Sequence, residues 1–230
     1  MEQDLARTAS AVESLNSTAT IDYRAEVVRK SIHLVSFSIP TVYYFITKEL
    51  ALWILVPITL AFLAVDIARY VSPPVARWFY RWFKWLLRRH EQDHTTMRLS
   101  GATNVLLSAV FCVAVFPKII TVSAFAILII SDITSALVGR RYGRHRFLAK
   151  SLEGTLSFFA TAVLVILVAP KVEGSSAEYL IGFVAAAVGA LVEASSIRLD
   201  DNISVPVSIG FTLWLLYAVF LPSLDLFILG

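Results

Sequence analysis

The sequence predicts an all-α, polytopic integral membrane protein with about seven transmembrane helices and one amphipathic helix at the membrane interface. Of the 230 residues, 57% are hydrophobic, which is more than a soluble domain of this size carries. Apolar runs of about 17–25 residues, the length that an α-helix needs to cross a bilayer, recur along the chain. The single cysteine, Cys112, excludes a disulfide framework and a cysteine-based metal site within the chain.

Seven spans are expected after a polar tail over residues 1–20, and together they form a single transmembrane domain over residues 21–230. They are predicted near Ser31–Thr47, Leu50–Ile67, Ala102–Phe116, Ile119–Val138, Leu156–Ala169, Tyr179–Ile197 and Val205–Leu226. Pro40 should kink the first span, because a proline inside a helix removes a backbone hydrogen bond. Asp66 lies near the end of the second span, and Pro73 and Pro74 end that segment.

The segment Val75–His90 has a different pattern. Its cations recur every three or four residues and so form one stripe on a helix, while tryptophan, phenylalanine and leucine cover most of the rest; the cations are Arg77, Arg81, Lys84 and Arg88. This pattern is typical of a helix that lies in the headgroup plane. We expect it to anchor the protein to the membrane and to contribute no catalytic group.

The basic residues predict the orientation. With the N-terminus in the cytoplasm, seven spans place all but three of the 20 Lys and Arg residues on the cytoplasmic side, the exceptions being Lys48, Lys118 and Lys171. Cytoplasmic segments of membrane proteins show this excess of Lys and Arg. The charged clusters at residues 29–33, 90–98, 132–153 and 193–202 then share one face, where we expect them to converge on a pocket.

The segment Ser131–Thr155 carries the strongest chemical signal. Asp132 is a lone carboxylate at the end of an apolar run, and it is followed by two glycines, Gly139 and Gly143, and by five cations: Arg140, Arg141, Arg144, Arg146 and Lys150. A carboxylate can hold a divalent metal, glycine lets backbone approach a phosphate, and cations neutralise phosphate charge. The plainer interpretation is a basic cytoplasmic loop with Asp132 buried against a polar neighbour.

Two further clusters are candidates for the same pocket. Arg29 and His33 lie four residues apart and therefore on one helix face, with Lys30 beside them, although they can equally be topological cations. Glu193 lies among apolar residues, where a carboxylate is costly. It precedes three hard oxygen donors of the kind that Mg²⁺ takes, which alternatively form only a turn after a helix: Asp200, Asp201 and Asn202.

The segment His90–His94 matches the H-E-x-x-H pattern of zinc proteases, in which two histidines bind zinc and the glutamate activates water. No obvious third ligand accompanies it. Glu91 and Asp93 are better interpreted as polar pocket residues or as solvated charges.

Together these motifs resemble the signature of the CTP-dependent lipid-alcohol kinases, namely the dolichol kinases, phytol kinases and CTP-dependent diacylglycerol kinases. The central part of the resemblance is Asp132-x-x-x-Ala136-x-x-Gly139-Arg140-x-x-Gly143 followed by Lys150-Ser151-x-Glu153-Gly154. Its remaining parts are the first-helix motif (Arg29, Lys30 and His33), the acidic loop (Glu91 and Asp93 before Gly101), and the last motif (Glu193 and Asp200–Asn202 before Pro206). The resemblance covers roughly Arg24 to the C-terminus.

The resemblance implies transfer of the γ-phosphoryl group of CTP to the hydroxyl of a membrane lipid alcohol, such as a polyprenol, phytol or diacylglycerol. It implies a Mg²⁺ site at Asp132 with Asp200 or Asp201. It implies triphosphate binding by Gly139, Arg140, Gly143, Arg144, Lys150 and Ser151. Catalytic roles would fall to Asp132, Lys150, Glu153 and Glu193, with Glu193 and Asp132 both open as acceptor of the hydroxyl proton. The pocket would be completed by Arg29, Lys30, His33, Glu91, Asp93 and Asn202.

Three alternatives remain open from the sequence. The Asp132–Gly154 stretch is also similar to CDP-diacylglycerol synthases, but the sequence after Asp201 lacks the glycine turn and the trailing Asp-Arg of that family. A non-catalytic protein that binds anionic lipid would explain Val75–His90 but does not need intramembrane acids. A zinc protease is the most distant alternative. The expected partners are CTP, a lipid alcohol and the bilayer, with no nucleic acid, and the sequence does not indicate an oligomeric state.

Overall fold

The computed structural model describes residues 27–83, 99–195 and 199–227. The predicted tail, the second half of the predicted interfacial helix, and Glu91 and Asp93 with the H-E-x-x-H motif around them lie outside these residues.

The described residues are almost entirely helical, which confirms the predicted all-α class. A helix over residues 27–35 is followed by α2 (Ser38–Phe45), α3 (Lys48–Val71), α4 (Pro73–Phe83), α5 (Gly101–Val115), α6 (Lys118–Tyr142), α7 (Leu152–Val168), α8 (Ser176–Ala194) and α9 (Asp201–Phe220). The strands β1 (Arg146–Phe147) and β2 (Lys150–Ser151) pair antiparallel as a short hairpin between α6 and α7.

Four of the described helices, α3, α6, α8 and α9, are long and apolar enough to cross a membrane, while α5 and α7 are shorter apolar helices. These helices indicate a membrane protein. Each of the seven predicted spans overlaps a helix, although the last one continues six residues beyond the end of α9, and the number of segments that cross the bilayer stays a prediction.

The first predicted span is bent, as its proline suggests. A turn at Ser36 and Phe37 separates the helix over residues 27–35 from α2. Pro40 has no N–H to bond with the carbonyl of Ser36, four residues earlier, and its ring clashes with that carbonyl in a regular helix. The Ser36 carbonyl instead accepts a hydrogen bond from the N–H of Ile39 at 3.0 Å. The bend therefore lies one turn before the proline.

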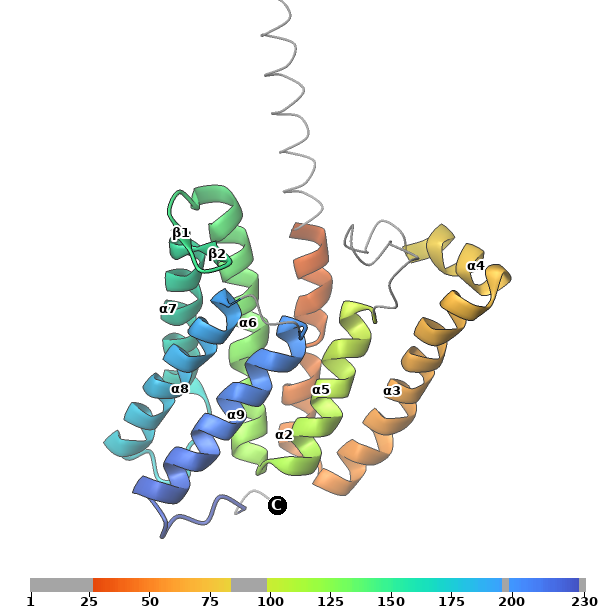
Figure 1. Ribbon diagram of the computed structural model, residues 1–230. Helices are drawn as coiled ribbons and strands as arrows, with labels where there is room; N and C mark the ends of the chain where they lie inside the picture. The colour runs from red at the N-terminus through yellow and green to blue at the C-terminus, as the bar shows by residue number, and fades with distance from the viewer. Residues whose placement is uncertain (1–26, 84–98, 196–198, 228–230) are drawn as a thin grey trace, which may run out of the picture.

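Helix α6 is the centre of the bundle, and α3 is at its edge (Figure 1). Almost every residue of α6 from Lys118 to Asp132 is buried, and α7, α9 and α2 pack around it. In contrast, α3 packs mainly on α5 and α4 and exposes large apolar side chains, among them Trp53, Leu60 and Phe62. Such a surface suits contact with lipid chains rather than with water.

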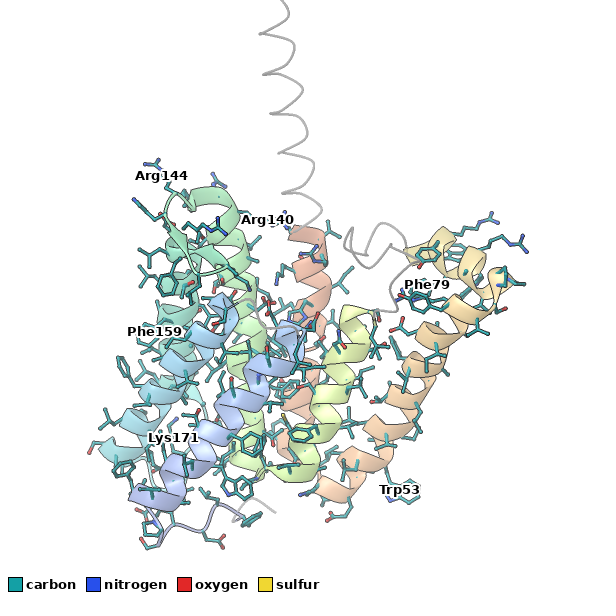
Figure 2. The ribbon with its side chains drawn as sticks, in the orientation of Figure 1. Trp53, Phe79, Arg140, Arg144, Phe159 and Lys171 are labelled. Atoms are coloured by element: carbon teal, nitrogen blue, oxygen red, sulfur yellow. The ribbon has the colours of Figure 1, made fainter. Side chains whose placement is uncertain are left out.

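The helix ends divide the polar residues between two ends of the bundle. The β1–β2 hairpin, α4, the start of α5, the end of α8 and the start of α9 lie at one end (Figure 1). Arg140 and Arg144 lie at that same end, whereas Lys171 lies at the other (Figure 2). The arrangement agrees with the expected gathering of charged clusters on one side, and the assignment of that side to the cytoplasm stays a prediction.

The predicted orientation can be tested with single cysteines placed at the two ends. Arg144→Cys and Glu173→Cys both replace exposed side chains, and Glu173 lies in the same loop as Lys171. In sealed right-side-out membrane vesicles, a membrane-impermeant maleimide should label Glu173→Cys, while Arg144→Cys should need permeabilisation. The native Cys112 is fully buried and serves as an internal negative control. Labelling of both positions from the same side would contradict the topology.

Candidate polar active site

The hairpin between α6 and α7 is anchored to the end of α8. Leu148, at the hairpin turn, has a positive φ of 50°, and the next residue, Ala149, donates its backbone N–H to the carbonyl of Ala194 at 3.0 Å. Carbonyls in the last turn of a helix have no partner within the helix, so they are available for such contacts. This contact sets β2, which begins at Lys150, beside Glu193, the residue before Ala194.

Lys150 forms ion pairs with two carboxylates. Its Nζ donates to Glu193 Oε1 at 2.7 Å and to Asp201 Oδ2 at 2.8 Å, and Ser135 Oγ donates to the same Glu193 oxygen at 2.8 Å. Burial by itself lowers the pKa of Lys150, but the carboxylates of Asp201 and Glu193 outweigh it, so the pKa lies above its ordinary value. Lys150 is therefore a fixed positive charge that joins the hairpin to α8 and α9.

A second ion pair includes Asp132 of α6 and lies next to the group around Lys150, which α6 joins through Ser135. Lys30 Nζ contacts Asp132 Oδ2 directly, and His33 Nε2 lies 3.6 Å from the same oxygen. Asp132 and Ser135 are three residues apart on α6 and so lie on one face of the helix. We call the combined group of side chains the polar centre; its members are Lys30, His33, Asp132, Ser135, Lys150, Glu193 and Asp201. The sequence predicted the convergence of these segments, although Ser135 was not among its candidates.

Burial makes the polar centre chemically unusual. Glu193 is only 1% exposed, and among the described residues its Oε2 atom has no hydrogen-bond partner. A buried carboxylate oxygen without a donor is costly. Buried ionisable groups in apolar helices are expensive enough that they usually serve a function.

The glycines of the central motif lie against protein backbone. A Cβ atom on Gly143 would lie 2.2 Å from the carbonyl oxygen of Gly139 and 2.8 Å from Ser151 Oγ, and one on Gly154 would lie 3.1 Å from the carbonyl oxygen of Ser135. Ser151 caps α7 by accepting the N–H of Gly154 at 3.2 Å. Residues with a Cβ atom would not fit at Gly143 and Gly154 without a shift of the chain where α6 approaches α7. Contact of Gly139, Gly143 and Ser151 with phosphate stays a prediction.

Other predicted site residues lie around the polar centre. Glu153 accepts from the backbone N–H of His145 at 3.2 Å and contacts the ring of His145 at 2.8 Å, so it shapes the loop that carries Arg144. Asp200 caps α9, its Oδ1 accepting from the backbone and side-chain amides of Asn202 at 3.0 and 2.7 Å. Arg140 is exposed in the last turn of α6, Arg144 is exposed on the loop that follows, and Arg29 lies one residue before Lys30.

The oxygen donors of the polar centre suit Mg²⁺ by their chemistry. Among the described residues no three His, Cys, Asp or Glu side chains lie close enough to hold a metal ion, and Asp132 and Asp201 are each paired with a lysine. Magnesium in phosphoryl-transfer sites is usually held by only one or two carboxylates together with substrate phosphates. Asp132 and Asp201 fit that donor set, and Glu193 Oε2 is a further buried acceptor.

A cavity of about 420 Å³ adjoins the polar centre. Its walls come from the helix over residues 27–35 and from α3, α4, α5, α6 and the first turn of α9. About half of the lining side chains are apolar, and the polar ones include Arg29, Lys30, His33, Asp66, Asp132 and Asn202. The pocket residues that the sequence proposed within the described part of the chain therefore do line one cavity.

The sequence did not identify the polar network on the other wall of this cavity. Asp66 Oδ2 accepts from the backbone N–H of Ser100 at 2.7 Å and from Thr103 Oγ1 at 2.6 Å, and Asp66 Oδ1 lies 3.4 Å from Arg69 Nε. In the sequence Asp66 is recognisable as an acidic residue near the end of an apolar span, but no sequence pattern indicates its partners. Its carboxylate joins the end of α3 to the start of α5.

An uncharacterized protein of Rickettsia prowazekii (strain Madrid E) is 29% identical to this chain over 191 residues, which covers 82% of this chain and 93% of that protein. No protein-family model matches the chain, and no solved structure matches it. The comparisons therefore leave the function to be argued from the site.

Removal of Lys150 alone from its ion pair should be costly to stability. Lys150→Met leaves the buried carboxylate of Glu193 uncompensated, and we expect it to lower the free energy of unfolding by about 2 kcal/mol or more. The double variant Lys150→Met/Glu193→Gln should recover most of this loss, because the amide carries no charge. Thermal unfolding in detergent measures both.

Arg146→Met is the matched control, since it removes an exposed cation from the same hairpin and should change stability by less than about 0.5 kcal/mol. A double variant that is no more stable than Lys150→Met would refute the ion-pair interpretation.

Proposed function

We propose that the protein is a membrane kinase that transfers the γ-phosphoryl group of CTP to the hydroxyl of a lipid alcohol. The observation that carries the proposal is the polar centre itself: carboxylates and lysines from segments far apart in sequence meet inside an apolar helical bundle. Their segments are those that resemble the lipid-alcohol kinases.

Phosphoryl transfer suits such a site, because it asks a protein mainly for positioning and for neutralisation of charge. Lys150 is held by two carboxylates at a fixed place, and Arg140 in the last turn of α6 and Arg144 in the loop after it lie at the same end of the bundle (Figure 2). We assign these three cations to the triphosphate. Glu153 supports them by holding the loop through His145.

Magnesium, held by Asp132 and Asp201, would supply further neutralisation of the phosphate charge. The choice of CTP over other nucleotides rests on the resemblance alone.

A neutral lipid hydroxyl suits the mostly apolar surface of the cavity beside the polar centre. A lipid phosphate brought next to a triphosphate would instead need additional cations to offset the repulsion of two polyanions. The segment Ile203–Gly210 has no Lys, Arg or His for that purpose, and two of the basic residues that line the cavity, Lys30 and His33, are already beside Asp132.

The position of the transferred label distinguishes a kinase from a cytidylyltransferase. A kinase joins the lipid oxygen to the γ-phosphorus and releases CDP, while a cytidylyltransferase joins a lipid phosphate to the α-phosphorus and releases pyrophosphate. Purified protein in detergent is incubated with Mg²⁺, with CTP labelled at either phosphorus, and with phytol, a polyprenol, diacylglycerol or phosphatidic acid. We expect γ-label, and no α-label, in the product of an alcohol. Transfer of α-label to phosphatidic acid would replace the kinase by the synthase.

Asp132→Asn should reduce kcat by about 10² or more, because it removes a charge assigned to stabilising the transition state. Glu49→Gln is the matched control: it also removes one carboxylate charge, but from an exposed position in the first turn of α3 at the other end of the bundle. Initial rates are measured after both variants have been shown to match the parent in elution volume and thermal unfolding. A rate within a few-fold of the parent for Asp132→Asn would remove Asp132 from the reaction.

A further inference from the structure

The cavity between α3 and the helix over residues 27–35 has two kinds of wall. One wall, from α3 and α5, is apolar over Phe62, Val65 and Val105 and has the Asp66 network at its edge. The other carries Asp132, with Lys30 and His33 beside it. Its volume of about 420 Å³ lies within the range of about 300–1,000 Å³ that small-molecule sites occupy. An amphiphile with one polar end would satisfy both walls.

The two carboxylates of the cavity are not equivalent. Asp66 already accepts from Ser100 N and Thr103 Oγ1 and faces Arg69, so its oxygens are used by the fold. Asp132 is paired through Oδ2 with Lys30 and His33. Glu193 does not line the cavity. Asp132 is thus the cavity carboxylate that belongs to the polar centre, and the one that an incoming hydroxyl can reach.

The cavity is also placed for access from the membrane. Trp78 of α4 lines it and is 53% exposed, and Phe62 of α3 lines it and is 45% exposed, so both side chains reach from the cavity to the outer surface. Helix α4 carries Arg77 and Arg81 beside these aromatic residues, which is the composition of a helix in the headgroup region. The open side of the cavity therefore faces the level of the membrane where the hydroxyl of a lipid lies.

We infer that this cavity binds the hydroxyl end of a long-chain lipid alcohol, with the hydroxyl donating a hydrogen bond to Asp132 and the chain leaving past Trp78 and Phe62 into the bilayer. The inference deepens the proposed function and rests on it for the reaction, but binding of the alcohol does not require turnover. The inference selects Asp132, rather than Glu193, as the carboxylate next to the lipid hydroxyl that accepts the phosphoryl group. The nucleotide then lies on the side of Lys150, so the two substrates approach the polar centre from different directions.

A photoactivatable probe tests the site without relying on activity. The probe is a long-chain primary alcohol with a diazirine near the hydroxyl end, added to the full-length protein in detergent or in phosphatidylcholine vesicles, and the labelled residues are mapped by peptide mass spectrometry. Labelling should concentrate on the lining segments of α3 and α5 and should be suppressed by excess phytol. A matched probe with a methyl ether in place of the hydroxyl should label these segments far less. Equal labelling by both probes, or labelling spread over the outer faces of the bundle, would overturn the inference.

Two variants on α3 provide the kinetic counterpart. Ala61 lines the cavity and Ala64 does not, although both are exposed on the same helix. Ala61→Phe should raise KM for the alcohol by about tenfold, as expected when a side chain fills a binding space, and should leave KM for CTP unchanged. Ala64→Phe should leave both unchanged. Equal effects of the two variants on KM for the alcohol would overturn the assignment of the cavity.

The failures of the two proposals are distinguishable. If no nucleotide label reaches any lipid but the hydroxyl-dependent labelling of the cavity persists, the kinase assignment fails and the alcohol site stands. If γ-label reaches an alcohol while the probe avoids the cavity and Ala61→Phe behaves as Ala64→Phe, the kinase assignment stands and the alcohol site is wrong.

Discussion

The rest of the site depends on the placement of one partly buried cation, Lys150, between two carboxylates. Its contacts with Glu193 and Asp201 join the β1–β2 hairpin to α8 and α9, and Ser135 brings α6 into the same group. A buried ion pair adds little net stability compared with apolar packing, whereas breaking one by removing a single partner is costly. The arrangement therefore contributes mainly by fixing where charged groups lie at the end of an apolar bundle.

The helices were predictable because the length of an apolar run is set by the bilayer and can be recognised without knowledge of packing. Their ends were less predictable, because polar caps set them. Helix α7 begins at Leu152, four residues before the predicted span, since Ser151 caps it, and α9 begins at Asp201 rather than near Val205, since Asp200 caps it. Hydropathy detects where the membrane contact ends, which is not where the helix ends.

The candidate site was predictable as a set of segments but not as a set of contacts. Charge in apolar sequence marked Asp132 and Glu193, and the excess of basic residues on one side predicted that their clusters would meet. The pairing of Lys30 with Asp132, and of Lys150 with Glu193 and Asp201, depends on helix packing that no local pattern encodes. The same holds for Asp66, whose partners Ser100 and Thr103 lie more than thirty residues away.

The charge balance of the polar centre gives a physical reason for its composition. Two lysines face three carboxylates, so each carboxylate has a cation beside it in the protein alone. In the proposed reaction Asp132 and Asp201 would hold a magnesium ion, which would neutralise part of the charge of the triphosphate, and Lys150 would contact phosphate oxygens. Lysines and carboxylates compensate one another in the protein alone, and together they would compensate the nucleotide and its metal when these are bound, which a low-dielectric site requires. A centre made only of cations, or only of carboxylates, would meet that requirement in one of the two states alone.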